Sequence, residues 1–308
     1  MRVNKTVGRY APSPSGRMHL GNAFTAVLSW LFARNDDGEF LLRIEDLDPD
    51  RCKSEYTKLV IEDLLWLGLD WDGEGPMQST RSEAYEAVFH HFSDLGLVYP
   101  CYCSRAELHA ASAPHSSDGT YVYPGTCRNL SDSVRSTILR KPSFRICVPD
   151  REIVFEDFLQ GKVKENLASD TGDFILRRPD GVFAYQLAVS VDDFAMGINQ
   201  VVRGKDLLSS TARQIWLIEL LGGEAPQYCH VPLLCASDGH RLSKRNADID
   251  FSYIRANKSP EAVLGFLAYC AGILNRPNSI SLKELLSEFR PEKLRKDDVI
   301  IDFNEWFS

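Results

Sequence analysis

The chain has 308 residues, of which 44% are hydrophobic, so it can bury a large core as two domains or as one domain with an insertion. Its net charge of -8 excludes a protein that coats nucleic acid with a broad basic surface, so any RNA contact is local. The longest nearly apolar run, Ala262 to Leu274, has 13 residues and is too short to cross a bilayer. The first ten residues lack the apolar segment of a secretory signal. We therefore expect a cytoplasmic protein with no membrane partner.

Strands and helices alternate along the first hundred residues. The segment from Val7 to Ala11 is predicted to be a strand that enters a turn rich in Pro and Gly, and Phe40 to Ile44 is predicted to be a second strand. Helical periodicity is found from Asn22 to Arg34, from Ser54 (a predicted N-cap) to Leu67, and from Arg81 to Leu95. This order predicts an α/β fold with a parallel sheet covered by helices.

The pattern changes at Cys101, after which the chain is predicted to be loop-rich as far as Asp173. Regular elements then return, which indicates that an insertion interrupts the sheet. They are predicted as strands at Phe174 to Leu176, Ile198 to Val202 and Val231 to Cys235, and as helices at Thr211 to Leu221, Pro260 to Ala271 and Leu282 to Phe289. We predict that residues 1–100 and 174–247 form the two halves of a catalytic core. Residues 101–173 are predicted to form an insertion between them, and residues 248–308 a helical C-terminal segment.

The segment from Ala11 to Asn22 carries a candidate nucleotide site. Two prolines and a glycine form a stiff turn after a strand, and His19 and Gly21 stand where a helix is predicted to begin. A helix N-terminus offers free N–H groups to phosphate, and a glycine lets a flat base approach the backbone. A histidine that only caps the helix is the alternative for this motif taken alone.

A cluster of cations, Arg241 to Arg245, follows a predicted strand and a turn at Asp238–Gly239. Clustered cations on a loop are suited to stabilising the charge that grows on a polyphosphate leaving group. A solvated basic loop is the alternative for this cluster alone. The two phosphate-type motifs flank one interrupted sheet, and the chain lacks the glycine-rich loop of P-loop NTPases.

Together these segments resemble class I aminoacyl-tRNA synthetases. His19-Leu20-Gly21-Asn22 is similar to their HIGH motif, and Leu242-Ser243-Lys244-Arg245 is similar to their KMSKS loop. The resemblance implies a Rossmann-like, parallel-sheet nucleotide-binding core that binds ATP with Mg²⁺. It implies His19 and Lys244 as catalytic residues, and it implies an ATP site formed by His19, Gly21, Asn22, Ser243 and Lys244.

Four further segments resemble the glutamyl-tRNA synthetases in particular: Gly8 to Gly16, Arg43 to Asp48, Tyr185 to Ala188 and Val201 to Gly204. L-Glutamate carries two carboxylates and one ammonium group, so its pocket needs guanidinium groups and a carboxylate. Taken singly, Glu45 is better explained by a surface salt bridge and Arg203 by a solvated strand end. The resemblance implies a glutamate site formed by Arg9, Tyr10, Ala11, Pro12, Ser13, Glu45, Tyr185 and Arg203.

The predicted insertion begins with a candidate zinc site. Cys101 and Cys103 are followed by Cys127, and three thiolates with one further ligand form a closed, tetrahedral structural site. Spacing alone leaves the fourth ligand open among His109, His115, Tyr121 and Tyr123. The resemblance extends to family members with a Cys-x-Cys…Tyr-x-x-x-Cys pattern, and it implies Tyr123 and one structural Zn²⁺ per chain.

The chain stops soon after the KMSKS-like loop, where full-length glutamyl-tRNA synthetases continue into an anticodon-binding region. It therefore resembles a short, zinc-bearing branch of the family that transfers glutamate to queuosine in the anticodon of tRNA(Asp), and that activates glutamate without tRNA. A truncated enzyme that charges tRNA(Glu) is one alternative. A non-catalytic zinc protein that binds tRNA or nucleotide and a small nucleotidyltransferase with a His-x-Gly-His motif are two others.

Overall fold

A computed structural model describes residues 5–104, 122–239, 242, 251–302 and 306. The first half of the chain folds as predicted, with small shifts of the boundaries. Ser54 is the first residue of its helix rather than the N-cap, which is Lys53 and makes no side-chain capping bond. The elements of this half are β1 (Val7–Tyr10), α1 (Leu20–Asn35), β2 (Glu39–Ile44), α2 (Ser54–Trp66), β3 (Glu74–Met77), the 3₁₀ helix η1 (Gln78–Thr80), α3 (Ser82–Asp94) and β4 (Val98–Cys101).

The range predicted to be loop-rich contains three strands, so that prediction is wrong for residues 143–166. The strands were missed because charged residues flank or interrupt their short apolar runs. In β6, exposed and buried positions alternate from Glu152 to Val154, and β7 places lysines on either side of Val163, as is common at sheet edges. The elements of this range are α5 (Asp132–Arg135), β5 (Ser143–Ile146), β6 (Glu152–Asp157), β7 (Gly161–Asn166) and the π-helical turn η2 (Leu167–Thr171).

Beyond this range the predicted helices are present, but one predicted strand is split. Pro232 lacks a backbone N–H, and the segment predicted as one strand from Val231 to Cys235 is the end of one strand and most of another. The elements are β8 (Phe174–Arg177), α6 (Tyr185–Ala195), β9 (Gln200–Gly204), η3 (Lys205–Ser210), α7 (Thr211–Leu220), β10 (Gln227–Val231), β11 (Leu234–Ala236), α8 (Phe251–Asn257), α9 (Pro260–Ala271), α10 (Leu282–Glu288), η4 (Pro291–Lys293) and β12 (Val299–Ile301).

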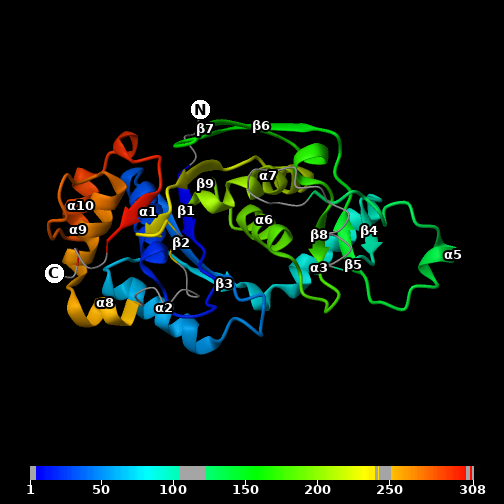
Figure 1. Cartoon of the computed structure of the whole chain (residues 1–308), viewed down its shortest axis with the longest axis horizontal. Coiled ribbons are helices and arrows are strands. Elements are labelled where there is room, and N and C mark those ends of the chain that lie inside the picture. Colours follow the sequence, from blue (N-terminus) through cyan, green and yellow to red (C-terminus); the bar gives the residue numbers. More distant parts are fainter. Residues whose placement is uncertain (1–4, 105–121, 240–241, 243–250, 303–305, 307–308) are drawn as a thin grey trace.

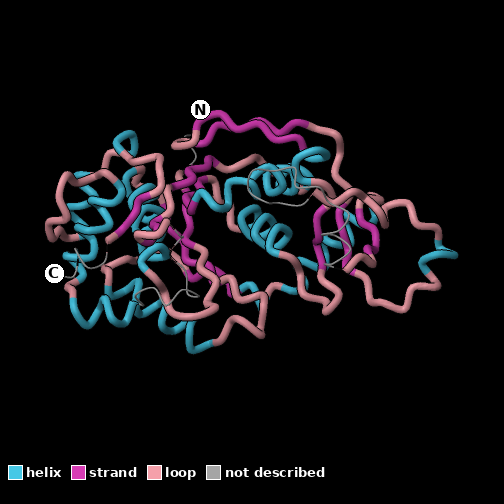
Figure 2. Tube along the Cα trace, viewed as in Figure 1, coloured by secondary structure: helices cyan, strands magenta, loops and turns pink. Residues whose placement is uncertain are grey.

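A seven-stranded sheet in the order β3-β2-β1-β9-β10-β6-β7 forms the centre of the molecule, and all neighbours pair in parallel except β6 and β7 (Figures 1 and 2). The predicted parallel-sheet α/β fold is therefore confirmed. A smaller antiparallel sheet, β4-β5-β8, lies at the far end of the molecule, beside α5 (Figure 1).

Alternate residues of the central strands face two separate cores. On β9, Val202 belongs to the core that includes α1, α9 and α10, whereas Val201 belongs to the core that includes α3, α6 and α7. Side chains of a strand alternate between the faces of its sheet, so helices packed on both faces bury both sets. The sheet is thus covered on both sides, and ligands can reach it only at the strand ends. Among the described helices, none has the length and apolar character needed to cross a membrane.

Candidate functional site

The strand order reverses between β1 and β9, because β1 continues to β2 on one side while β9 continues to β10 on the other. In open parallel sheets, ligands bind at the carboxyl ends of the strands beside such a reversal. A cavity of about 680 Å³ lies at this place. It is lined by residues that end or directly follow the three strands β1, β2 and β9, among them Tyr10, Glu45 and Gly204.

This cavity brings together nearly all the residues that the sequence predicted for glutamate and ATP. Leu242 also lines it, while the next two residues, Ser243 and Lys244, lie outside the described residues. The role of each predicted residue stays a prediction. The predicted residues in the lining are Arg9, Tyr10, Ala11, Pro12, Ser13, His19, Gly21, Asn22, Glu45, Tyr185 and Arg203.

Helix α1 begins at the cavity. His19 is its N-cap, and the backbone N–H of His19 donates a hydrogen bond to Oδ1 of Asn22 at 3.1 Å. A Cβ at Gly21 would lie 3.0 Å from Cε1 of His19, so the glycine leaves room for the imidazole ring. The free N–H groups of the first helical turn and the macrodipole favour an anion at this end of α1.

A buried carboxylate joins two guanidinium groups beneath the cavity. Asp193 of α6 accepts hydrogen bonds from Nε of Arg9 at 3.2 Å and from Nη1 of Arg43 at 2.6 Å. Arg43 also donates through Nη2 to Glu45 at 3.1 Å. All four side chains are more than nine-tenths buried, so the charges must be paired. Burial opposes ionisation of Asp193, but the Arg43 and Arg9 guanidinium groups hold its pKa below the ordinary value.

Glu45 is therefore not a surface salt bridge. Burial raises the pKa of its carboxyl group, against the opposing effect of the Arg43 and Arg9 guanidinium groups. Arg43 fixes one oxygen of the carboxylate, and the side chain also lines the cavity. Glu45 is thus placed to meet a cationic group on a ligand.

Arg203 lies at the end of β9 and is also buried, but it has a different set of partners. Its Nη1 donates to Oε1 of Gln214 at 2.6 Å, its Nη2 donates to Oγ1 of Thr211 at 2.8 Å, and its Nε donates to Nε2 of His230 at 3.0 Å. None of its hydrogen bonds to described residues goes to a carboxylate. An arginine in such surroundings can pair with an anionic group that a ligand brings.

The sequence reasoning missed Asp193, Asp157, His230 and the role of Arg43. One signal was available: the pair Asp192–Asp193 interrupts the apolar run that starts at Leu187 of α6. Carboxylates on a buried helix face require partners. The two aspartates therefore predict cationic side chains buried on the strands against which α6 packs. The other missed residues lie in strands far apart in sequence, and no local pattern brings them together.

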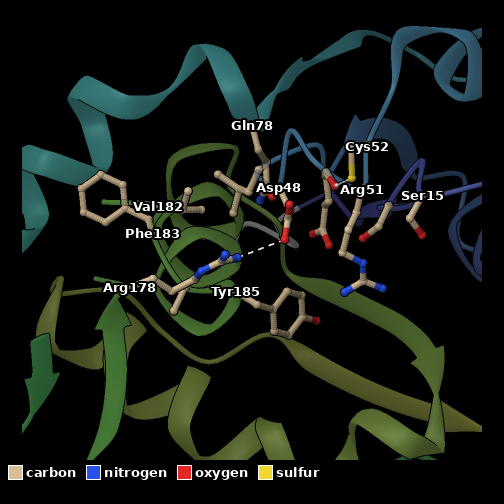
Figure 3. A pocket seen from close by; sticks show the side chains of 13 residues that line it. Ser15, Asp48, Arg51, Cys52, Gln78, Arg178, Val182, Phe183 and Tyr185 are labelled. Atoms are coloured by element: carbon tan, nitrogen blue, oxygen red, sulfur yellow. Dashed lines mark hydrogen bonds and ion pairs between the residues drawn. The ribbon is translucent and has the colours of Figure 1, made fainter. Parts of the chain in front are cut away.

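A second cavity of about 330 Å³ adjoins the first, and Glu45 and Tyr185 line both. Figure 3 shows an ion pair in it, from Arg178 to Asp48, at 3.0 Å between nitrogen and oxygen. Apolar side chains of Val182 and Phe183 lie on one side of this pair, and polar side chains of Arg51 and Ser15 lie on the other (Figure 3). The space can therefore receive a group with one apolar and one polar face.

The predicted metal site is assembled beside the small sheet. The sulfur atoms of Cys101, Cys103 and Cys127 lie within 4.8 Å of one another, and those of Cys103 and Cys127 are 3.5 Å apart. Oη of Tyr123 lies 3.4 Å from Sγ of Cys101 and 3.7 Å from Sγ of Cys103. Ligands of a tetrahedral zinc ion with bonds of about 2.3 Å are separated by roughly 3.8 Å. The four side chains therefore fit a metal ion, whereas His109, His115 and Tyr121 lie outside the described residues.

Comparison with protein families identifies one match along most of the chain. Residues 5–295 match the family described as tRNA synthetases class I (E and Q), catalytic domain. The chain is 50% identical over 281 residues to a protein of Nitratidesulfovibrio vulgaris named glutamyl-Q tRNA(Asp) synthetase, and the match covers 87% of this chain and 86% of that protein.

The chain is also similar to glutamate–tRNA ligases. A glutamate–tRNA ligase of Sulfurihydrogenibium is 38% identical, and the match covers 96% of this chain but 64% of the ligase. The crystal structure of a glutamate tRNA ligase from Elizabethkingia meningosepticum in complex with its amino acid superposes with a TM-score of 0.82 at 28% identity. That superposition covers 98% of this chain and 68% of the other.

The buried pairing of Asp193 makes a prediction for stability. The substitution Asp193→Asn leaves two buried guanidinium groups short of an anion, and we expect it to lower the free energy of unfolding by about 3–5 kcal/mol. The pKa of Asp193 is lowered in the folded state, so this contribution is complete above the ordinary carboxyl pKa near 4 and is lost only as pH falls through the folded value. The loss measured by urea unfolding should therefore be equal at pH 8 and pH 6.

The control is Asp132→Asn, which removes an exposed carboxylate paired with Arg135 on the same short helix. Exposed pairs contribute little, so this variant should unfold within about 1 kcal/mol of the wild type. A loss for Asp193→Asn no larger than that of the control would contradict the pairing.

Proposed function

Because this chain belongs to the class I tRNA synthetase family (E and Q) and is a ligase, we propose that it activates L-glutamate with ATP, without tRNA, and transfers the glutamate to queuosine in tRNA(Asp). The observation that carries the first step is the buried guanidinium of Arg203, whose described partners are neutral. A substrate carboxylate supplies the missing anion. Glutamine brings a neutral amide in place of one carboxylate, so it satisfies these groups poorly.

The rest of the amino-acid site follows from the same lining. Arg9 and Arg203 serve the two carboxylates of glutamate, and Glu45 serves the ammonium group. Tyr185 provides an aromatic wall and a hydroxyl donor, while the segment from Tyr10 to Ser13 forms the edge that follows β1.

Activation forms glutamyl-adenylate. The α-carboxylate of glutamate attacks the α-phosphate of ATP, the new bond is a mixed anhydride, and pyrophosphate leaves. The nucleophile is already anionic, so no general base is needed, and catalysis rests on positioning and charge stabilisation. We assign ATP binding to His19, Gly21 and Asn22 at the start of α1, together with Ser243 and Lys244, and we assign charge stabilisation on pyrophosphate to Lys244. Mg²⁺ accompanies ATP.

We assign one structural Zn²⁺ to Cys101, Cys103, Tyr123 and Cys127. Two backbone N–H groups support anionic ligands at this site: that of Cys127 donates to Oη of Tyr123 at 2.8 Å, and that of Tyr102 donates to Sγ of Cys127 at 3.4 Å. When bound, the ion cross-links two segments of a region with little apolar core. None of the eight cysteines, all of which lie among the described residues, forms a disulfide, which supports a location in the reducing cytoplasm.

The acceptor proposal rests on two observations. The chain is 50% identical to a relative named glutamyl-Q tRNA(Asp) synthetase and 38% identical to a glutamate–tRNA ligase, so it is more similar to the first of these two. The second cavity shares Tyr185 and Glu45 with the glutamate site, so a nucleoside there would lie beside the activated carboxyl group. The cyclopentenediol of queuosine is a vicinal diol, as is the ribose end that class I enzymes acylate.

Mapping the acceptor tests this function. The enzyme is incubated with ATP, labelled glutamate and purified tRNA(Asp) from cells with or without queuosine, and the labelled nucleoside is identified after digestion. We expect label only on queuosine, because only this base offers the diol. Equal labelling of both tRNA(Asp) samples, or labelling of tRNA(Glu), would favour charging of tRNA(Glu) instead.

The zinc assignment predicts one zinc per chain in protein purified without chelators, measured by elemental analysis. The substitution Tyr123→Phe removes one of four ligands, so we expect it to weaken zinc binding by at least about tenfold in competition with a chelator dye. Tyr102→Phe is the control, because it removes a neighbouring hydroxyl that is not among the four donors. Full zinc affinity in Tyr123→Phe would reject the tyrosine as a ligand.

A further inference from the structure

Arg203 and His230 lie side by side on the neighbouring strands β9 and β10. Residue 203 of β9 is paired in register with residue 230 of β10, and both side chains are buried, with exposures of 4% and 0%. Nε of Arg203 lies 3.0 Å from Nε2 of His230. Arg203 is a residue proposed to bind glutamate, so this contact links the glutamate site to a histidine that has no role in the proposed activation step.

The contact fixes the state of the imidazole. A guanidinium can only donate hydrogen bonds, so Nε2 of His230 must accept and carries no proton. The proton is then on Nδ1, which lies 2.5 Å from Oδ2 of Asp157 and donates to it. His230 is therefore neutral, with one specific tautomer, and it stands between a carboxylate and a guanidinium.

Asp157 is itself held in place by the backbone. The N–H groups of Leu159 and Gln160 donate to its Oδ1 at 3.1 and 2.9 Å, and the N–H of His230 also donates to the carboxylate. Burial opposes ionisation of Asp157, but the His230 and backbone hydrogen bonds hold its pKa below the ordinary value. Burial, assisted by the Arg203 charge, likewise holds the pKa of His230 below its ordinary value, against the effect of Asp157. The ionised acid and the neutral base agree with the tautomer that the geometry requires.

We propose that His230 and Asp157 are positioning residues for glutamate recognition: Asp157 sets the tautomer of His230, and His230 orients the guanidinium of Arg203 toward the substrate carboxylate. This inference rests on the proposed glutamate site. It assigns a function to a chain of contacts that runs from β6 through β10 to β9 and ends in the cavity.

The acceptor that His230 offers to Arg203 is neutral, and this has a consequence that a carboxylate acceptor would not have. Arg9 meets Asp193 directly, through Nε at 3.2 Å and Nη2 at 3.4 Å, so its charge is already paired within the protein. His230 contacts Nε of Arg203 but places no anion against it, and the Asp157 carboxylate lies on the other side of the imidazole ring. Arg203 is thereby oriented in advance without losing its need for an anion, which is the arrangement that rewards a charged substrate.

Two substitutions of His230 separate orientation from packing. Asn at this position reproduces the donor to Asp157 but is too short to reach Arg203, whereas Gln places an acceptor near the former Nε2. We expect His230→Asn to weaken glutamate binding about 10- to 100-fold, as for the loss of a hydrogen bond to a charged group, with ATP affinity changed less than threefold. His230→Gln should recover most of the glutamate affinity. Both affinities are measured by calorimetry at pH 7.5, with melting temperatures recorded for each variant.

Asp157→Asn tests the relay one residue further from the substrate. The backbone donors of Leu159 and Gln160 retain the amide oxygen, so the amide N–H₂ faces Nδ1 of His230 and moves the imidazole proton to Nε2. An N–H then opposes the N–H of Arg203, and glutamate affinity should fall by at least tenfold although residue 157 does not touch Arg203. Gln160→Ala is the control: it removes a bond to the carbonyl of His230 and should leave glutamate affinity unchanged.

The outcomes distinguish the two levels of the proposal. A wild-type protein that does not bind glutamate overturns the proposed function and this inference with it. A wild-type protein that binds glutamate, with His230→Asn and Asp157→Asn binding equally well, overturns this inference alone. Equal losses of glutamate and ATP affinity in the variants, without recovery in His230→Gln, would also overturn it, because a merely structural histidine affects both ligands.

Discussion

Burying a guanidinium without an adjacent carboxylate is the constraint on which the site depends. A charge removed from water needs hydrogen bonds and an opposite charge. Without the opposite charge, burial costs several kcal/mol of free energy. The protein supplies Arg203 with four neutral acceptors among the described residues, whereas it gives Arg9 and Arg43 a shared carboxylate on Asp193. The proposed affinity for glutamate rests on this difference, because a substrate carboxylate supplies the anion that the described residues around Arg203 do not.

The fold makes this arrangement possible because strands that are far apart in sequence end at the same edge of the central sheet. Arg9 lies near the end of β1, Glu45 follows β2 and Arg203 lies near the end of β9, and the three strands are parallel neighbours. Helices bury both faces of the sheet, so the carboxyl edge is the place where polar groups can meet a ligand. The helix α1 begins at the same edge, where His19, Gly21 and Asn22 line the cavity.

The sequence was sufficient for the parts of this arrangement that are local. Helical periodicity placed α1 and α9 to within two residues, and short motifs identified nearly half of the residues that line the cavity. The parts that it did not reveal depend on contacts between segments far apart. Asp193 and Arg9 are separated by 184 positions, and Asp157 and His230 by 73, so no periodicity links them. The hairpin β6–β7 escaped for a different reason: its edge strand β7 carries lysines on both sides of Val163, where a core strand carries apolar residues.

Pyrophosphate exchange without tRNA is the measurement that tests the account most directly, with glutamate and glutamine compared as the activating amino acid. The two substrates differ only in the side-chain carboxylate, so the comparison reports whether the proposed site, with Arg9 and Arg203 in its lining, requires a second anionic group on the substrate. We expect exchange with glutamate, and at least about 100-fold lower efficiency with glutamine, since a buried charge left without its partner costs 2–5 kcal/mol. Exchange with glutamine at an efficiency near that of glutamate would contradict the account.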